Sequence, residues 1–187
     1  MKKILVVVDM QNDFIDQVLG SPEAKNIVPN VIQRVKEYIS HGNAVFFTQD
    51  THPDDYLESQ EGKNLPVQHA IKGSSGWQLC SEIKELIPLV EAQSDHPVII
   101  EKPGFGSLEL IDEIKKVIID EKDTQIEIIG LCTDICVMVN VMVLKTGFPE
   151  TKLVVDANCC AGTSSEYHTS ALQIMNVCQV EIKNFGF

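Results

Sequence analysis

Short runs of β-branched and other apolar residues alternate along the chain with segments of helical periodicity. The first run, KILVVV at residues 3–8, is apolar on both faces, which is typical of a strand inside a parallel sheet. Similar runs predict strands at 44–49, 97–102, 125–131, 151–156 and 180–184. Strands that alternate with helices favour parallel pairing. We therefore expect an α/β fold in which helices flank a six-stranded parallel sheet in three layers.

The segments between these runs predict helices. Apolar residues recur at helical spacing from Val31 to Ile39, Pro29 suits the first turn, and Gly42 suits the end. Further helices are predicted at 81–87, 107–120, 134–146 and 165–178. The 187 residues are a usual length for one domain. We expect a single domain over residues 1–187.

Composition excludes some classes of partner. The formal net charge is −12, which repels phosphate backbones and anionic membrane surfaces. Asp9 interrupts the first apolar run, which is too short for a signal peptide, and no segment reaches the length of a membrane span. We expect a cytoplasmic protein with no nucleic-acid or membrane partner. Its six cysteines are then mainly thiols.

Several residues that can carry chemistry follow the predicted strands. Asp9 follows the first, Asp50 and His52 follow the second, Lys102 ends the third, and GLCTDIC at 130–136 follows the fourth. Function in open parallel sheets gathers beyond the carboxyl ends of the strands. These residues are therefore predicted to meet in one cleft.

Cys136 is the candidate nucleophile within this group. Thr133 or Asp134 is the predicted N-cap, which puts Cys136 in the first helical turn. The helix dipole and a neighbouring Lys102 favour a thiolate there. Asp9 is placed to accept the thiol proton, and unpaired backbone N–H groups of the turn are suited to an oxyanion.

Each of these residues also has an ordinary structural interpretation. An aspartate at a strand end can cap a turn, a lysine can be solvated, and buried free cysteines are usually packing residues. We read the adjacent Cys159 and Cys160 as packing. Cys132 and Cys136 form a C-x-x-x-C pair, which leaves a redox module as an alternative, although thioredoxin-like motifs are C-x-x-C. A dinucleotide-binding domain is less favoured, since no G-x-G-x-x-G follows the first strand.

The loop at 50–76 is long for a compact domain, and such loops are often functional. Asp50 and His52 have a D-x-H spacing, and with His69 and one more acid they are candidate ligands of a divalent metal. The alternative is that these residues are solvated side chains of a polar loop.

Five motifs together resemble a known family. They are VVVDMQNDF (6–14), TQDTHP (48–53), LPVQHAIKGSSGW (65–77), EKPGFGS (101–107) and GLCTDICV (130–137). In order and spacing they resemble the cysteine hydrolases of the isochorismatase-like superfamily, and within it the nicotinamidases. The resemblance covers essentially the whole chain and implies the same six-stranded, Rossmann-like fold.

The resemblance implies a catalytic triad of Asp9, Lys102 and Cys136. It also implies a cis peptide bond just before Cys132, and an oxyanion hole made by the backbone amides of Cys132 and Cys136.

The resemblance further implies a metal, most often zinc, on Asp50, His52 and His69, with the pyridine nitrogen of the substrate as a ligand. Many relatives supply another histidine a few residues after the D-x-H. Here Glu61 or Glu58 is the candidate in its place, and Glu61 is preferred.

The resemblance places the substrate between aromatic walls that match Phe14, Trp77 and Phe105, with Leu19 as a further candidate contact. Phe105 stands where a tyrosine is common, and the residue after His69 departs from the cysteine that often stands there.

The resemblance thus implies hydrolysis of a small linear amide, with nicotinamide converted to nicotinate and ammonia in NAD salvage, by a homo-oligomer (dimer or tetramer). The alternative enzyme is another amidase of the superfamily, acting on an N-carbamoyl or ureido compound.

Overall fold

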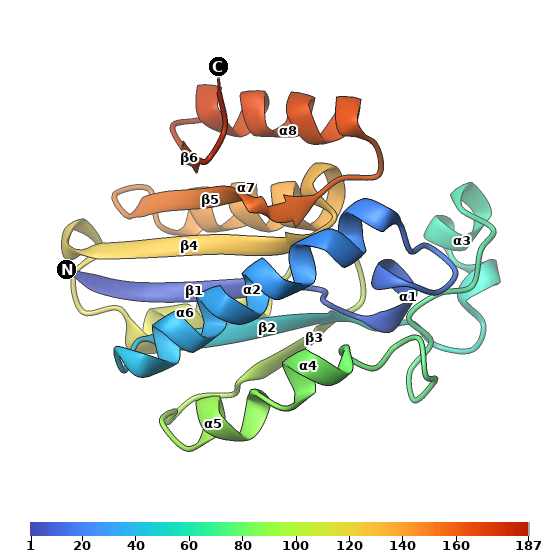
Figure 1. Cartoon of the computed structure of the whole chain (residues 1–187), viewed down its shortest axis with the longest axis horizontal. Coiled ribbons are helices and arrows are strands. Elements are labelled where there is room, and N and C mark those ends of the chain that lie inside the picture. The colour runs from blue at the N-terminus through green and yellow to red at the C-terminus, as the bar shows by residue number, and fades with distance from the viewer. Residues whose placement is uncertain (187) are drawn as a thin grey trace.

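The computed structural model describes residues 1–186 and contains one six-stranded sheet (Figure 1). The strands are β1 (Lys2–Val8), β2 (Ala44–Asp50), β3 (Ile99–Lys102), β4 (Thr124–Leu131), β5 (Lys152–Ala161) and β6 (Glu181–Lys183). They lie in the order β3-β2-β1-β4-β5-β6, and every pairing is parallel. The predicted parallel sheet is confirmed.

The central strand β1 explains why its sequence is apolar on both faces. Each side chain from Ile4 to Val8 is fully buried. Val6 lies between Phe46 of β2 and Ile128 of β4. Helices cover both faces of such a sheet, so neither face of this strand meets water.

Helices lie on both faces of the sheet (Figure 1). The long helix α2 (Pro22–Ser40) crosses the face toward the viewer, and α6 (Leu108–Val117) and α7 (Met138–Gly147) lie behind the strands. Helix α8 (Ser165–Val177) packs against α7 and β6. The shorter elements are α1 (Asn12–Ile15), η1 (Tyr56–Glu58), α3 (Gln60–Asn64), α4 (Ser81–Lys84), α5 (Ile87–Glu91), η2 (Glu121–Asp123) and η3 (Thr133–Val137).

Helix α2 begins earlier than the sequence predicts. Ser21 is its N-cap, with a side-chain oxygen that accepts a hydrogen bond from the Ala24 N–H, and Pro22 occupies the first turn. Pro29 therefore lies inside the helix. The prediction that Pro29 lies in the first turn is wrong, because Pro22 and Pro29 fit a first turn equally well by sequence alone.

Other elements also differ from their predicted bounds, and two of these differences are larger than a shift of a few residues at an end. The segment predicted as one helix at 81–87 is divided into α4 and α5. Strand β5 extends to Ala161 rather than ending at 156, so Cys159 and Cys160 lie within it. Both side chains are buried, as the packing interpretation predicts.

A buried charged network holds α2 on the sheet. Arg34 contacts Glu127 of β4 at 2.6 Å and Asp156 of β5 at 2.8 Å, and Tyr38 donates a hydrogen bond to Glu127 at 3.0 Å. Both carboxylates are almost completely buried. Because a buried charge needs a partner, these contacts fix where α2 lies, and its first residues reach the edge that carries the candidate site.

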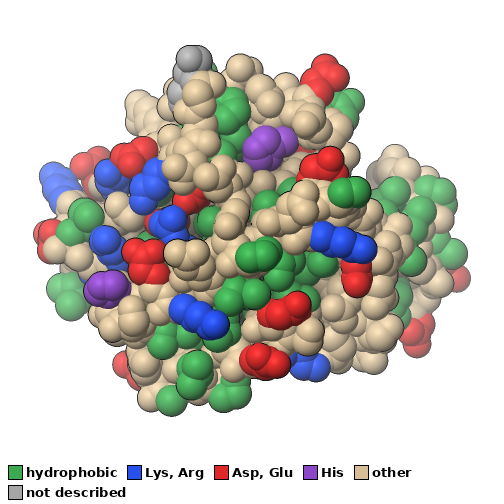
Figure 2. Space-filling model, in the orientation of Figure 1, with side chains coloured by type: hydrophobic (Ala, Val, Ile, Leu, Met, Phe, Trp, Pro, Cys, Tyr) green, Lys and Arg blue, Asp and Glu red, His purple; other side chains and the backbone are tan. Residues whose placement is uncertain are grey.

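The surface agrees with the composition. Acidic and basic side chains are interspersed on the face seen in Figure 2. Among residues 1–186, no helix combines the length and apolar character that crossing a membrane requires. All six cysteines are free thiols.

Candidate functional site

The candidate site lies at the carboxyl edge of the sheet, where the strand order changes direction between β1 and β4. Asp9 follows β1 there. It has a left-handed backbone (φ 47°), a conformation that aspartate tolerates better than most residues. Its side chain is completely buried and accepts a hydrogen bond from the Thr48 hydroxyl at 2.7 Å. The carboxylate therefore has a fixed position beside β2.

Gly130 lets the two central strands approach closely at this edge. Its φ is 117°, and a Cβ at this position would lie 2.1 Å from the Val8 carbonyl oxygen. Only glycine fits, so Asp9 after β1 and the turn after β4 that carries Cys136 are held close together.

Cys136 lies in a π-helical turn, Thr133–Val137, that precedes α7. The peptide bond between Leu131 and Cys132 is cis, as the resemblance implies. The Cys132 carbonyl accepts hydrogen bonds from the N–H groups of Ile135 and Val137, at 3.1 Å each. The π-turn therefore wraps the backbone tightly around Cys136.

The predicted N-caps of this helix are wrong, since Cys132 occupies that position. Asp134 instead accepts hydrogen bonds from the Thr163 N–H and hydroxyl, at 2.8 and 2.5 Å. The Thr133 hydroxyl lies 2.8 Å from Nδ1 of His168. Asp134 therefore joins the turn to the segment between β5 and α8, and Thr133 joins it to α8 itself.

Lys102 lies at the centre of the site and is 1% exposed. Its Nζ is 2.7 Å from Asp9 Oδ2, 3.2 Å from Asp50 Oδ1 and 3.5 Å from Cys136 Sγ. It also donates a hydrogen bond to the Gly104 carbonyl at 2.9 Å. The structure thus brings together the three residues of the predicted triad.

The charge states differ from one expectation. Burial raises the pKa of the Cys136 thiol well above its usual value, and the Asp9 carboxyl raises it further, against the opposing effect of Lys102. Lys102 does lower this pKa, as expected, but desolvation has the larger effect, so the net shift favours the thiol, which needs a base.

The pKa of the candidate base is suited to that task. Burial raises the pKa of Asp9 above its usual range, although Lys102 opposes the shift. Burial lowers the pKa of Lys102, but nearby anionic groups, above all Asp9, raise it more, so the lysine keeps its proton. A permanently charged ammonium next to a carboxyl of raised pKa can steady charge during a proton transfer.

A second cluster adjoins the triad through Asp50. Its Oδ2 is 3.0 Å from His52 Nε2 and 3.7 Å from His69 Nε2, and these donor atoms all lie within 4.8 Å of one another. His69 Nδ1 lies 2.8 Å from the Val67 carbonyl, which favours a proton on Nδ1 and leaves the Nε2 lone pair directed at the cluster. Two imidazole nitrogens and a carboxylate are a donor set that divalent metals such as zinc accept. The cluster can bind a metal.

Glu61 of α3 reaches the same cluster. Its Oε1 lies 3.8 Å from His52 Nε2 and 3.6 Å from His69 Nε2. Glu58 is exposed in η1, and within residues 1–186 the acidic partners of the two histidines are Asp50 and Glu61. Of the two predicted glutamates, Glu61 is the one that faces the histidines.

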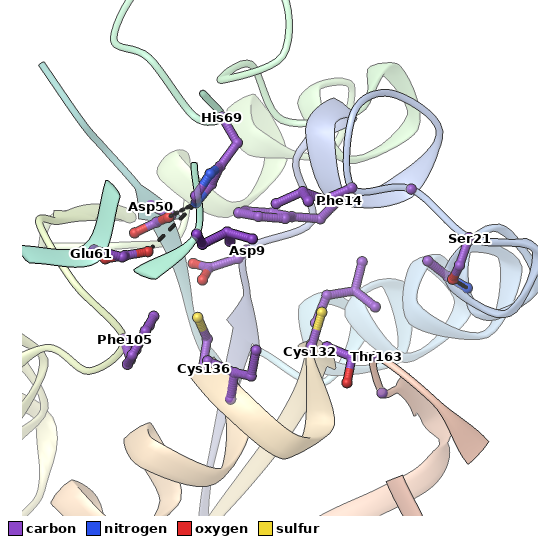
Figure 3. A pocket seen from close by; sticks show the side chains of 17 residues that line it. Asp9, Phe14, Ser21, Asp50, Glu61, His69, Phe105, Cys132, Cys136 and Thr163 are labelled. Atoms are coloured by element: carbon purple, nitrogen blue, oxygen red, sulfur yellow. Dashed lines mark hydrogen bonds and ion pairs between the residues drawn. The ribbon is translucent and has the colours of Figure 1, made fainter. Parts of the chain in front are cut away.

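A cavity of about 390 Å³ joins the two clusters (Figure 3). Asp9, Cys132 and Cys136 lie in its middle, with Asp50, Glu61 and His69 to one side. The other lining residues are Phe14, Leu19, Gly20, Ser21, Ala24, Leu65, Phe105, Leu131, Ile135, Gly162 and Thr163.

The predicted substrate contacts do not all line this cavity. Phe14, Leu19 and Phe105 do, and the Phe14 ring meets the His69 ring edge-on at 5.6 Å. Trp77 is half-buried outside the lining, with its indole N–H donating to the Thr51 hydroxyl at 2.9 Å. Trp77 therefore stabilises the loop at 50–76 through its bond to Thr51 and does not form a wall of the cavity.

Sequence reasoning missed two buried side chains of the first loop. The Gln11 amide accepts from the Asp50 N–H at 2.7 Å and donates to the Asp50 and Trp77 carbonyls at 2.9 Å. The Asp13 carboxylate accepts from the Ala70 N–H at 2.7 Å, next to His69. Both side chains hold the backbone on either side of the histidine cluster in place, at Asp50 and at Ala70. They lie within the quoted motif at 6–14, but nothing in the pattern shows that they reach residues 50 and 70.

A third residue missed from the sequence is Asn140 of α7, which is fully buried. Its amide donates to the Cys136 carbonyl at 2.8 Å and to the Phe105 carbonyl at 3.1 Å, and it accepts from the Ser107 N–H at 3.0 Å. It therefore ties the turn that carries Cys136 to the segment that carries Phe105.

Solved structures share this fold. The chain matches the nicotinamidase PncA of Bacillus subtilis with a TM-score of 0.79 and 26% identity, over 98% of this chain and 100% of that one. It matches a zinc complex of the pyrazinamidase of Pyrococcus horikoshii (TM-score 0.78, 20% identity, 99% and 100% covered). An N-carbamoylsarcosine amidase of Thermoplasma acidophilum also matches (0.73, 23%, 98% and 96%). No curated protein sequence matches the chain.

The match to a family model agrees with these likenesses. The model of the isochorismatase domain matches residues 3–183, which include all six strands except Lys2 of β1 and every residue of the two clusters. With the fold and this coverage together, the chain belongs to the isochorismatase family of hydrolases.

Proposed function

We propose that this protein is a cysteine-dependent amidase that hydrolyses nicotinamide to nicotinate and ammonia, a reaction of NAD salvage. The observation that carries the proposal is the contact of Lys102 with Asp9 and Cys136 beside the Asp50, His52 and His69 cluster. The first group supplies amide chemistry, and the second is suited to hold a heteroaromatic ring through a metal.

The chemistry follows from the charge states of the triad. Asp9 removes the Cys136 proton as the sulfur attacks the amide carbonyl, and Lys102 steadies the resulting charges. The backbone amides of Cys132 and Cys136 hold the oxyanion. Asp9 then returns the proton to the departing ammonia, which leaves a thioester. Water, activated by Asp9, cleaves the thioester and restores the thiol.

The metal ligands in this proposal are Asp50, His52, His69 and Glu61, with zinc as the expected ion. When bound, the metal is a Lewis acid that orients the substrate ring. Phe14 and Phe105 supply apolar walls next to it.

The test is ammonia release from nicotinamide by the purified protein. We expect Cys136→Ala to reduce kcat by at least about 10³-fold, because the nucleophile is gone, while the circular dichroism spectrum stays unchanged. Cys178→Ala is the matched control, since this thiol lies at the end of α8, outside the cavity. Loss of activity in Cys132→Ala with retention in Cys136→Ala would move the nucleophile to Cys132.

The same assay separates the alternatives. No ammonia from nicotinamide, with release from N-carbamoyl or ureido compounds, would support the other amidase class. No ammonia from any amide would leave the redox-module interpretation.

Zinc binding is tested by calorimetry on chelator-treated protein. We expect one zinc per chain in the wild type and a loss of at least tenfold in affinity for His69→Ala, because one nitrogen ligand is removed. The exposed His41 gives a control variant, His41→Ala, that should bind zinc as the wild type does. Equal affinities in all three proteins would contradict the ligand assignment.

A further inference from the structure

The cavity continues past the reactive thiol, away from the metal cluster. In Figure 3, Glu61, Asp50 and Phe105 lie on one side of Cys136, and Thr163 and Ser21 lie on the other. The cavity therefore extends to both sides of Cys136, and we call the side that contains Asp50, Glu61 and His69 the metal arm. We call the other side the α2 arm and define it by Leu19, Gly20, Ser21, Ala24, Ile135, Gly162 and Thr163.

The total volume is large for the proposed substrate. A cavity of 390 Å³ falls in the range of about 300–1,000 Å³ that holds drug-sized ligands. Nicotinamide is one six-membered ring with a carboxamide, and its ring is accounted for by the metal arm. The α2 arm is left without a substrate group.

The chemistry of the α2 arm is that of an uncharged, mainly apolar pocket. Its lining includes Leu19, Ala24 and Ile135, its polar side chains are the hydroxyls of Ser21 and Thr163, and none of its residues carries a charge. The Ser21 oxygen accepts a hydrogen bond from the Ala24 N–H. The N–H and hydroxyl of Thr163 both donate to Asp134, which leaves no free proton on that residue to bind a ligand anion. A short aliphatic group matches this lining better than a carboxylate or an ammonium.

The geometry of an amide decides which part of the substrate can reach this arm. A carbonyl carbon held over the Cys136 sulfur has two substituents besides its oxygen, and they diverge in one plane. If the acyl ring occupies the metal arm, the oxygen and the amide nitrogen both point away from it, and the proposed oxyanion hole at Cys132 and Cys136 takes the oxygen, which leaves the nitrogen to face the α2 arm. The α2 arm is therefore on the side of the leaving group.

We infer that the protein also hydrolyses secondary amides, R–CO–NH–R′, in which R′ is a short neutral aliphatic group that occupies the α2 arm. This inference rests on the proposed function and names its substrate class more fully. The C–S bond to Cys136 forms as the C–N bond breaks, and the thiol proton passes through Asp9 to the departing amine R′NH₂. Water then cleaves the C–S bond, which yields the carboxylic acid and the free thiol.

The first test compares nicotinamide with its N-propyl amide on zinc-supplied wild-type protein, with nicotinate measured by chromatography. We expect the kcat/KM of the N-propyl amide to lie within about tenfold of that of nicotinamide. Rapid turnover of nicotinamide with no detectable nicotinate from the N-propyl amide would overturn the inference.

Variants then locate the propyl group. Ala24→Leu fills the arm from the first turn of α2, and we expect it to lower the ratio of the two kcat/KM values, N-propyl over primary, by at least tenfold. Ala24→Val should give a smaller drop in the ratio and provides a milder change if the leucine variant folds poorly. Lys25→Leu is the matched control, because Lys25 is exposed on the same helix outside the cavity. An unchanged ratio in both Ala24 variants would place the propyl group elsewhere.

A binding measurement separates this inference from the proposed reaction. In zinc-supplied Cys136→Ala protein, the N-propyl amide should bind at least tenfold more tightly than nicotinamide, and Ala24→Leu should remove that gain. If the wild type makes no nicotinate from either amide but the N-propyl amide still binds more tightly, the proposed reaction is refuted and binding of the propyl group in the α2 arm is supported. Equal affinities of the two amides would refute the arm.

Discussion

Replacing Lys102 with methionine tests the electrostatic organisation of the site. Lys102 is the buried cation between Asp9, at 2.7 Å, and Asp50, at 3.2 Å. Methionine keeps an unbranched, apolar side chain but removes the charge. Asp50 retains His52 as a partner at 3.0 Å, so the Asp9 carboxylate loses the most.

The magnitude follows from what Asp9 can do in the variant. An unpaired buried carboxylate is so costly that the group takes up a proton instead. Protonating a carboxyl of ordinary pKa, about 3.9, at pH 7 costs roughly 3 × 1.4, or about 4 kcal/mol. That cost is the upper limit of the stability that Lys102→Met can lose through Asp9. It agrees with the roughly 3–5 kcal/mol lost when one partner of a buried ion pair is removed.

The pH dependence has a definite sign. In the variant, the pKa of Asp9 in the folded state lies above that in the unfolded chain, so the folded state binds more protons between the two values. Stability then falls as the pH rises through this window. The destabilisation relative to wild type should be largest near pH 7 and shrink by up to about 1.4 kcal/mol for each unit toward pH 5.

The assay is urea unfolding with linear extrapolation, on both proteins in chelator, at pH 5, 6 and 7. Lys115→Met is the control, because Lys115 pairs with Asp112 on the surface and should change stability by no more than about 0.5 kcal/mol. A loss below about 1 kcal/mol in Lys102→Met, equal at all three pH values, would mean that Asp9 is already neutral in the wild type. The charge assignment of the triad would then be wrong.

Three other variants test the framework of the site. Gly130→Ala should destabilise the protein by at least about 1–3 kcal/mol, since φ is 117° and a Cβ meets backbone; an unchanged thermal midpoint would contradict this. Asp13→Ala should cost about 1–3 kcal/mol in urea unfolding by leaving the Ala70 N–H unpaired, and calorimetry should show weaker zinc binding; unchanged zinc affinity would exclude a positioning role. Arg34→Met should lower the free energy of unfolding by roughly 1.5–3 kcal/mol, because the contacts with Glu127 and Asp156 are lost. Zinc affinity should stay constant, and weakened zinc binding would show that α2 influences the histidine cluster.

Much of the fold could be predicted because the relevant signals are local. The run at 3–8 is apolar on both faces, and a central parallel strand requires that pattern. The first and last residues of the helices and strands were less predictable. The start of α2 depended on choosing between Pro22 and Pro29, and only the packing of the intervening turns against the sheet distinguishes the two.

The candidate site was predictable to the extent that topology dictates it. Asp9, Lys102 and Cys136 follow strands that run in parallel, so their side chains must gather at one edge. The thiol pKa was not predictable, because it depends on how completely Cys136 is desolvated. The place of Trp77 depends equally on tertiary contacts, namely the hydrogen bond of its indole N–H to Thr51.

The amino-acid sequence by itself therefore determined the parallel sheet and the edge where reactive residues collect, because periodicity and strand ends are properties of neighbouring residues. Only the tertiary structure decided that Lys102 pairs with Asp9, that Glu61 rather than Glu58 faces the histidines, and that the cavity has a second arm. Contacts, desolvation and empty volume arise between segments far apart in the chain, and no local pattern encodes them.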